Sequence, residues 1–213
     1  MYIVNTICSI VCKQAHRLAT ENLDFHEAMM GRLIERELRL AINDGVSQFR
    51  VGLNMGVDIW AAKRVIHLRD CYFPYIKLHC YLPYETQANH WPEFWREPYF
   101  DVQAKADEVL ILQSRYTRGC MHRRNLEMLR GSGLLLALHD NVAEGGIDQA
   151  ISYAESRGIE TIVIRPQEGP DVPARLSGGD LDAGNGQSMS RLQMLSTKSG
   201  TFSSGRSASK VAW

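Results

Sequence analysis

The fold is decided by the stretch RVGLNMGVDIWAAK, Arg50 to Lys63. An apolar run from Phe49 to Leu53 enters a turn that contains Gly52, Asn54 and Gly56, and a helix-forming run follows. Glycines let the backbone approach a bound group, and the first amides of a helix are unpaired donors at the positive end of its dipole. The pattern therefore predicts a strand, a glycine turn and a helix N-terminus, which either holds a phosphate or is a plain tight turn.

On both sides of this stretch, strand-like and helix-like segments alternate along the chain. The predicted strands cover residues 3–11, 49–53, 76–82, 108–112, 134–138 and 161–164. The first predicted helix begins at a capping-box-like pair, Asp24 and Glu27, and ends at Gly45. The other predicted helices cover residues 57–68, 94–105, 121–130 and 145–157. This alternation predicts an α/β fold: a single Rossmann-like three-layer domain, residues 1–166, with a mostly parallel sheet. In such sheets ligands lie beyond the carboxyl ends of the strands.

The bulk composition narrows the function classes. The 213 residues are 45% hydrophobic and 23% charged, with a formal net charge of zero, which does not favour nucleic acid or an anionic membrane as a partner. The apolar runs are too short for a bilayer, and the charge order at the N-terminus is the reverse of a secretory signal, so a cytoplasmic location is expected. Residues 167–213 are rich in Gly, Ser, Asp and Asn, and are predicted to be a disordered tail.

The five cysteines do not suggest a metal or disulfide site. Their number is odd and no CxxC pair occurs, so we expect small buried thiols and no metal.

Several segments occur together in an order and spacing that resemble a known family. They are AHRL at 15–18, GLNMGVDIWAA at 52–62, IKLHCYLPYETQANHW at 76–91, ADEVLILQSRYTRGCMHRRNLEML at 106–129 and LLLALHDNVAEGG at 134–146. The chain resembles the YpsA-like family, a branch of the SLOG superfamily of Rossmann-like domains, over roughly residues 3–166. This superfamily also includes the cytokinin-activating LOG enzymes and the DNA-processing protein DprA.

The resemblance implies a ligand rather than a reaction. It implies binding of a nucleotide or a nucleotide-derived molecule, similar to ADP-ribose or NAD, by a regulatory, sensing or sequestering protein of bacterial or phage origin. No other cofactor is implied. Dimers or larger homo-oligomers, and a protein partner in cell division or the stress response, are further expectations from the resemblance.

The sequence also departs from the family pattern. The first loop is Ala15-His16-Arg17-Leu18 where the family resembles Gly-His-Arg-Pro, and the glycine pair is followed by Ile147 instead of Thr. The Thr and the catalytic Glu of the LOG enzymes are both missing after that pair. Binding is therefore favoured over the alternative of an N-glycosidase or phosphoribohydrolase. A DprA-like single-stranded DNA binder is disfavoured by the zero net charge.

The first candidate site residues follow the first two predicted strands. After the first strand, Arg17 is expected to clamp a phosphate and His16 to bond a ribose or base, unless both belong to a surface loop. In the second loop, the amides of Gly52, Asn54 and Gly56 would meet a phosphate. The acid of the second loop, Asp58, either caps the helix, which is the favoured role, or accepts a ribose hydroxyl.

The loop after the third strand supplies Tyr84, Glu85, Gln87 and Trp91. These side chains either read a base and ribose or form a helix-start network, and Glu85 is the candidate general base if the protein is an enzyme. Trp60 is expected in the core.

The remaining candidates follow the later strands. Arg124 and Asn125 are expected at the site because the family's Arg-Asn pair falls there, whereas Arg123 points elsewhere. Gly145 and Gly146 form a second candidate anion cradle, with Asp148 as the helix cap. At the end of the fifth predicted strand, His139 is expected to be a packing residue and Asp140 a turn residue.

Overall fold

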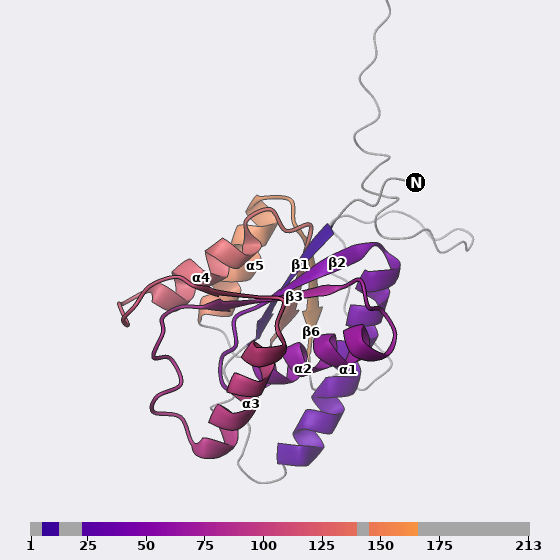
Figure 1. Ribbon diagram of the computed structural model, residues 1–213. Coiled ribbons are helices and arrows are strands. Elements are labelled where there is room, and N and C mark those ends of the chain that lie inside the picture. Colours follow the sequence, from indigo (N-terminus) through magenta and orange to yellow (C-terminus); the bar gives the residue numbers. More distant parts are fainter. Residues whose placement is uncertain (1–5, 13–22, 140–144, 166–213) are drawn as a thin grey trace, which may run out of the picture. The chain divides into compact units, whose positions relative to one another are not determined.

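A computed structural model describes residues 6–12, 23–139 and 145–165, which form a three-layer α/β/α arrangement (Figure 1). The elements run in the order β1 (Thr6–Cys12), α1 (Leu23–Asn43), β2 (Val46–Val51), α2 (Val57–Cys71), β3 (Lys77–Leu82), α3 (Glu93–Lys105), β4 (Glu108–Ile111), α4 (Cys120–Leu129), β5 (Leu134–Leu138), α5 (Gly146–Ser156) and β6 (Glu160–Ile164). The predicted α/β fold is confirmed. The predicted tail, residues 167–213, lies outside the described residues.

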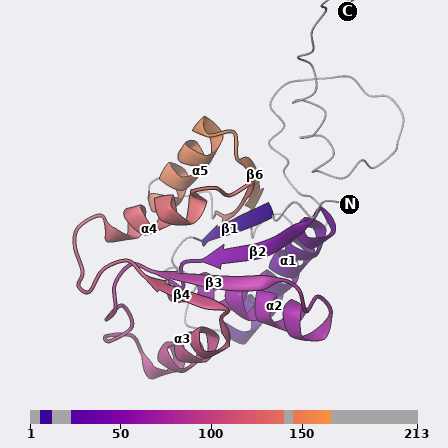
Figure 2. The ribbon, with the colours of Figure 1, turned by 45° about the horizontal axis from the view of Figure 1, so that its top comes forward.

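The described strands form one sheet in the order β4-β3-β2-β1-β5-β6, and every pair in it is parallel. Figures 1 and 2 show α1, α2 and α3 on one face of the sheet and α4 and α5 on the other. The chain reverses its direction of winding between β1 and β5. The carboxyl ends beside this switch point are where an open α/β sheet places its ligand site.

The core lies where the sequence pattern places it. All five residues of β5 are buried, as expected for a central parallel strand covered on both faces. Trp60 is 2% exposed and its ring lies 5.8 Å from that of Trp95, which confirms its core assignment. Four of the five cysteines are buried and free, and Cys71 is exposed.

The end of β2 differs from the prediction. The strand stops at Val51 instead of Leu53, because Leu53 has a φ of 48°. A strand cannot continue through this left-handed conformation, which is strained for a branched side chain. The apolar pattern alone does not reveal the turn, since Leu53 is fully buried like a strand residue.

The last turn of α4 is fastened to the sheet by the carbonyl oxygen of Met128. This oxygen accepts hydrogen bonds from Ser9 Oγ at 2.6 Å, Ser132 Oγ at 3.0 Å and Arg50 Nη1 at 2.9 Å. Carbonyls in the last turn have no partner within a helix, so these donors satisfy one of them. They also hold α4 over β1 and β2, and this placement brings the start of α4 to the β2–α2 turn.

The edge strand β4 is attached to β3 through Asp107. Its carboxylate accepts hydrogen bonds from Lys77 Nζ at 2.9 Å, Arg69 Nη1 at 3.0 Å and the Leu78 amide at 2.9 Å. Partial burial alone would raise the pKa of Asp107, but these bonds together lower it below the ordinary value of 3.8. The carboxylate therefore stabilises the fold only in its ionised form.

Replacing Asp107 with Asn is expected to lower the free energy of unfolding by about 1 kcal/mol at pH 7, because the lost ion pairs are partly screened by solvent. The folded-state pKa is depressed, so the contribution is complete above pH 3.8 and is lost as the pH falls through the folded value. Urea unfolding of both proteins between pH 2.5 and pH 7 measures this, with the pH values chosen around the titration. A cost that does not shrink in acid would contradict the assignment.

Candidate functional site

The turn between β2 and α2 is held by a single clamped peptide bond. The Leu53 carbonyl accepts from Gln87 Nε2 at 2.6 Å, and the Asn54 amide donates to Asp58 Oδ2 at 2.9 Å. Gln87 and Asp58 are both buried, at 4% and 2% exposed. One side chain from the first turn of α2 and one from the loop after β3 thus bond both ends of one peptide, which keeps Leu53 in its strained conformation.

Asp58 does not act as a conventional cap of α2. Its Oδ2 accepts from Asn54, which precedes the helix, and the residue before α2 is Gly56, with a φ of 95° and a ψ of −121° that favour glycine. The role of Asp58 is to fix the turn, and a ribose contact stays a prediction.

Arg124 fixes the same turn from the opposite layer. Arg124 lies in the first half of α4 and is 2% exposed. Its Nη1 donates to Gly52 O at 2.6 Å and to Asn54 Oδ1 at 3.1 Å. A Cβ at position 52 would lie 2.3 Å from Arg124 Cζ. Gly52 is therefore required by the guanidinium beside it, rather than by its own backbone angles.

Asn125 extends this connection to α5. Its Oδ1 accepts from Arg124 Nε at 3.1 Å and from Nη2 at 2.8 Å, while its Nδ2 donates to Gly146 O at 3.4 Å. The Arg124–Asn125 pair therefore joins the two glycine turns that the sequence offers as anion cradles. Because the guanidinium is buried and bonded to protein oxygens, Arg124 acts here as a brace, and a direct phosphate clamp by it stays a prediction.

The charges at this brace are shifted mainly by burial. Burial raises the pKa of Asp58 above 3.8, although the charge of Arg124 and the Asn54 amide act in the opposite direction. Burial likewise lowers the pKa of Arg124, against the effect of Asp58. Burial, and then the neighbouring Asp58 carboxylate, raise the pKa of Cys12 well above its ordinary value. Cys12 is thus a protonated thiol at neutral pH and not a nucleophile.

Two buried acceptor oxygens in this region lack a hydrogen bond of full geometry to any described residue: Asp58 Oδ1 and Gln87 Oε1. The Cys12 thiol lies close enough to Asp58 to influence its titration.

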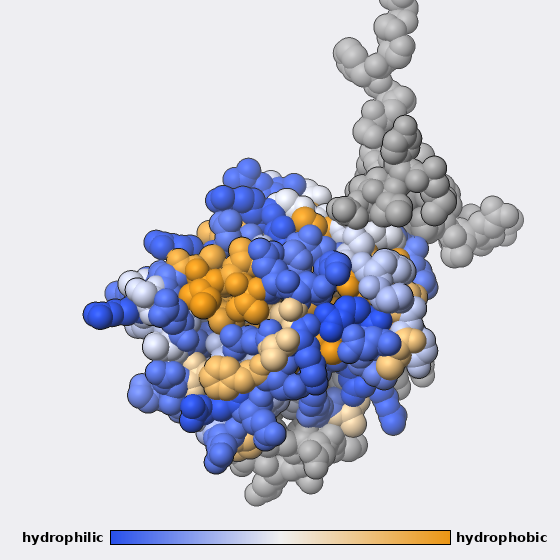
Figure 3. All heavy atoms as spheres, in the orientation of Figure 1, coloured by the Kyte–Doolittle hydropathy of each residue, from blue (hydrophilic) through white to orange (hydrophobic). Residues whose placement is uncertain are grey.

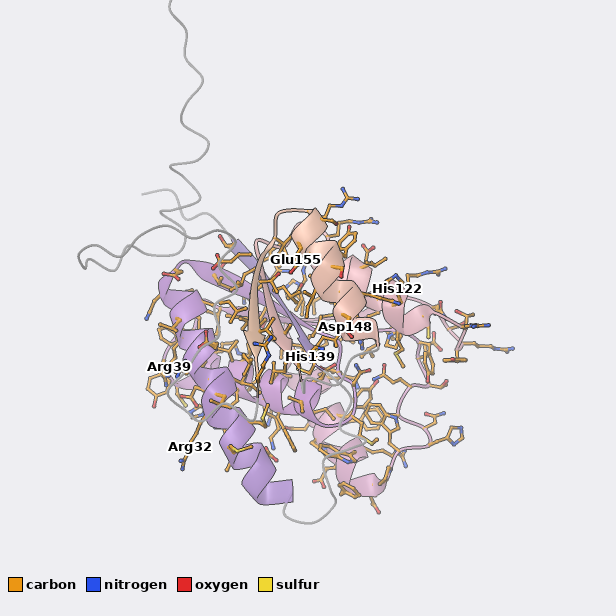
Figure 4. All side chains as sticks on the ribbon, turned by 180° about the vertical axis from the view of Figure 1, so that it is seen from behind. Arg32, Arg39, His122, His139, Asp148 and Glu155 are labelled. Carbon is orange, nitrogen blue, oxygen red and sulfur yellow. The ribbon has the colours of Figure 1, made fainter. Side chains whose placement is uncertain are left out.

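A His–Asp pair lies at the carboxyl end of β5, where the sequence interpretation assigned His139 to packing and Asp148 to capping the helix. The cap assignment is wrong, because the N-cap of α5 is Gly145 and no side chain of the described residues caps it. His139 Nε2 lies 2.8 Å from Asp148 Oδ1, and Figure 4 shows the two side chains directed toward each other. The histidine side chain is 11% exposed and the aspartate side chain 44%. The sequence places both residues at this sheet edge, since one ends a strand and the other begins the next helix, but their pairing depends on a contact between the two elements.

The other predicted site residues lie at the same edge with different exposure. Glu85 is exposed, and Trp91 is partly buried with its ring 5.1 Å from that of Tyr99, edge to face. Gly145 and Gly146 are exposed at the start of α5. His16, Arg17 and Asp140 lie outside the described residues.

The described residues hold no cluster of three or more His, Cys, Asp or Glu side chains suited to a metal ion. Among the helices of residues 23–139 and 145–165, none combines the length and apolar character that a bilayer crossing requires.

Comparison with known proteins agrees with this architecture. The family model described as the YspA SLOG family (YpsA) matches residues 19–169. A UPF0398 protein of Shouchella clausii is 30% identical over 162 residues, which cover 73% of this chain and 84% of the relative. UPF0398 proteins of Halalkalibacterium halodurans and Bacillus velezensis are each 30% identical over 128 residues, 59% of this chain and 67% and 70% of the relatives. The resemblance inferred from the sequence motifs is thereby confirmed, and the chain belongs to the YpsA family of SLOG proteins.

Proposed function

We propose that this protein binds a nucleotide or a nucleotide-derived ligand, such as ADP-ribose or NAD, at the carboxyl edge of its sheet, and acts as a regulatory, sensing or sequestering protein. The observation that carries the proposal is the Arg124–Asn125 brace, which holds Gly52 and Gly146 to one buried network. Gly52 follows β2 and Gly146 follows β5, the two strands that flank β1 at the switch point. A preformed edge of this kind lowers the ordering cost of binding.

The exposed parts of this edge have distinct roles in the proposal. Gly145 and Gly146 are exposed at the N-terminus of α5, where backbone amides and the helix dipole attract a phosphate. Glu85 and Trp91 belong to the loop after β3. Glu85 offers a carboxylate for ribose hydroxyls, and Trp91 offers a ring for a base. The buried side chains of Asp58 and Arg124 hold the β2–α2 turn through hydrogen bonds to its backbone.

A thermal-shift series with AMP, ADP, NAD and ADP-ribose tests the proposal, using Gly146→Asp and Gly146→Asn as a matched pair. Among the described residues, a Cβ at this position meets nothing closer than Asn125 Nδ2 at 3.7 Å, so the packing there admits a side chain at its first atom. A ligand at a hundred times its Kd should stabilise the wild type by about 2.7 kcal/mol. The aspartate puts a negative charge where the phosphate would lie, so we expect Asp to abolish the shift and Asn to retain most of it.

The ligand-free melting temperatures serve as the control in this series. An acid in the first turn of a helix is mildly stabilising, so the Asp variant should melt no lower than the Asn variant. Equal ligand shifts in both variants would remove α5 from the site, and no shift with any of the four ligands would contradict the proposed function.

Hydrolysis of an N-glycosidic bond is the alternative, and the exposed carboxylate of Glu85, in the same loop as the partly buried Trp91, is the observation that favours it. An enzyme of this kind would release a free base from AMP or NAD. Chromatography of the incubated mixtures detects that base, and its loss in Glu85→Gln with binding retained would assign catalysis to this residue.

A further inference from the structure

The loop between β4 and α4 and the first turn of α4 carry three arginines without acidic partners. From Leu112 to Leu126 the chain contains no Asp or Glu, and Arg115, Arg118 and Arg123 are all exposed. Among the described residues, no salt bridge or side-chain hydrogen bond involves these three guanidinium groups. We call residues 112–123 the basic loop. It projects at the left in Figure 1, and the left edge of the molecule in Figure 3 combines blue, hydrophilic atoms with pale ones.

Some other arginines of this protein do have acidic partners. Arg39 pairs with Glu35 at 2.9 Å, and Arg69 pairs with both Asp70 and Asp107 at 2.9 and 3.0 Å. In the basic loop, by contrast, like charges repel one another across a short segment. A surface of one charge sign attracts an anion from outside the chain.

The basic loop is attached to the neighbouring loop of the proposed site. The Glu85 amide donates to Gln113 O at 3.2 Å, and Gln113 Nε2 donates to Thr117 Oγ1 at 2.9 Å. The rings of Tyr84 and Tyr116 pack edge to face with centroids 5.6 Å apart. These contacts hold the loop in one conformation, so the arginines extend from a defined base next to Glu85.

The aromatic ring adds a second requirement on the partner. Tyr116 is 63% exposed although its edge packs against Tyr84, so a ring face stays available for a base or ribose. Arginine forks pair in bidentate fashion with phosphates, and arginine combined with an exposed tyrosine favours a phosphate-bearing nucleotide over an acidic peptide. The single acid of the adjoining loop, Glu85, reduces the local positive charge without cancelling it.

We propose that the basic loop is a binding surface for the outer phosphates of the nucleotide ligand, so that the protein selects nucleotides that carry two or more phosphates over monophosphates. This inference rests on the proposed function, which places the nucleoside and its first phosphate at the sheet edge, and it assigns the further phosphates to Arg115, Arg118 and Arg123.

The test measures calorimetric affinities for AMP, ADP, ATP and tripolyphosphate in the wild type and in Arg115→Gln/Arg118→Gln. The matched control is Arg32→Gln/Arg157→Gln, which removes the same charge from two exposed arginines on α1 and at the end of α5. We expect affinity to rise with the number of phosphates. The loop variant should weaken ATP and tripolyphosphate binding by about 10-fold or more, as expected for lost charge-assisted bonds, and the control by less than about twofold.

The outcomes separate this inference from the proposed function. Equal affinities for AMP and ATP, unchanged in the loop variant, would overturn the inference while the nucleotide site stands. Tripolyphosphate binding that the loop variant loses, without binding of any nucleotide, would support the anion surface and contradict the proposed function. No binding of any probe would overturn both.

Two further probes identify the source of the anion. Sulfate that binds as tightly as tripolyphosphate would show an adventitious anion surface only. Oligothymidylate that binds more tightly than ATP, and is lost in the loop variant, would overturn the proposal in favour of a nucleic-acid backbone. Because the replaced arginines are exposed, the melting temperature of the loop variant should stay within about 2 °C of the wild type.

Discussion

Replacing Arg124 with alanine is expected to lower the free energy of unfolding by about 3–5 kcal/mol. The substitution removes the donor that serves Gly52 O, Asn54 Oδ1 and Asn125 Oδ1, and it leaves the buried Asp58 carboxylate without its positive neighbour. Buried acceptors without donors lose their solvation and gain nothing in return. Urea unfolding followed by circular dichroism measures the loss.

A double-mutant cycle with Gly52→Ala is the control for this prediction. A Cβ at position 52 would lie 2.3 Å from Arg124 Cζ, so Gly52→Ala alone should be strongly destabilising. In the Arg124→Ala background the same change meets an empty space, and its cost should fall by about 2 kcal/mol. Additive costs would show that the guanidinium is not what position 52 must accommodate.

Replacing Asp58 with leucine is expected to cost a similar amount, about 3–5 kcal/mol, because it leaves the Arg124 charge buried and unpaired. The Asn54 amide also loses its acceptor. The matched change Asp58→Asn keeps an acceptor oxygen of the same shape, so it should cost only about 1–2 kcal/mol. Comparable costs for the two variants would argue that the acceptor oxygen at position 58 is of no consequence.

The pH dependence of Asp58→Asn should have the opposite sign to that of Asp107→Asn. Burial raises the folded-state pKa of Asp58 above 3.8, so the stabilisation from this group is complete below pH 3.8 and is lost as the pH rises through the folded value. The cost of Asp58→Asn is therefore largest in acid and decreases toward neutral pH. Urea titrations of both variants across this range read out two opposite slopes.

The order and type of the elements could be predicted because each depends on local sequence. The predicted and observed bounds of β5 are the same, Leu134 to Leu138. A strand that is buried on both faces is apolar at every position, so its two ends are easy to recognise in the sequence. β2 was placed three residues too far along the chain at its start and two at its end. The cause is the left-handed Leu53, which is maintained by Gln87 and Asp58 from outside the strand.

The candidate site was predicted in part for the same reason. Topology rules place every loop after a parallel strand at one edge, so the glycine turns at Gly52–Gly56 and Gly145–Gly146 could be grouped from the sequence. Burial could not be predicted for Arg124, because an arginine after Arg123 on a helix gives no local sign of which of the two enters the core. The pair of His139 and Asp148 also depends on contacts between two elements.

The sequence by itself determined the α/β class, the parallel sheet, the family and the edge at which a ligand would lie, because these follow from periodicity, turn residues and motif spacing along the chain. Only the tertiary structure decided that Arg124 and Asp58 are buried supports of the β2–α2 turn, and that Arg115, Arg118 and Arg123 stay exposed and unpaired. The physical reason is that burial and ion pairing are set by residues far away in the chain: Arg124 meets Gly52 across 72 positions.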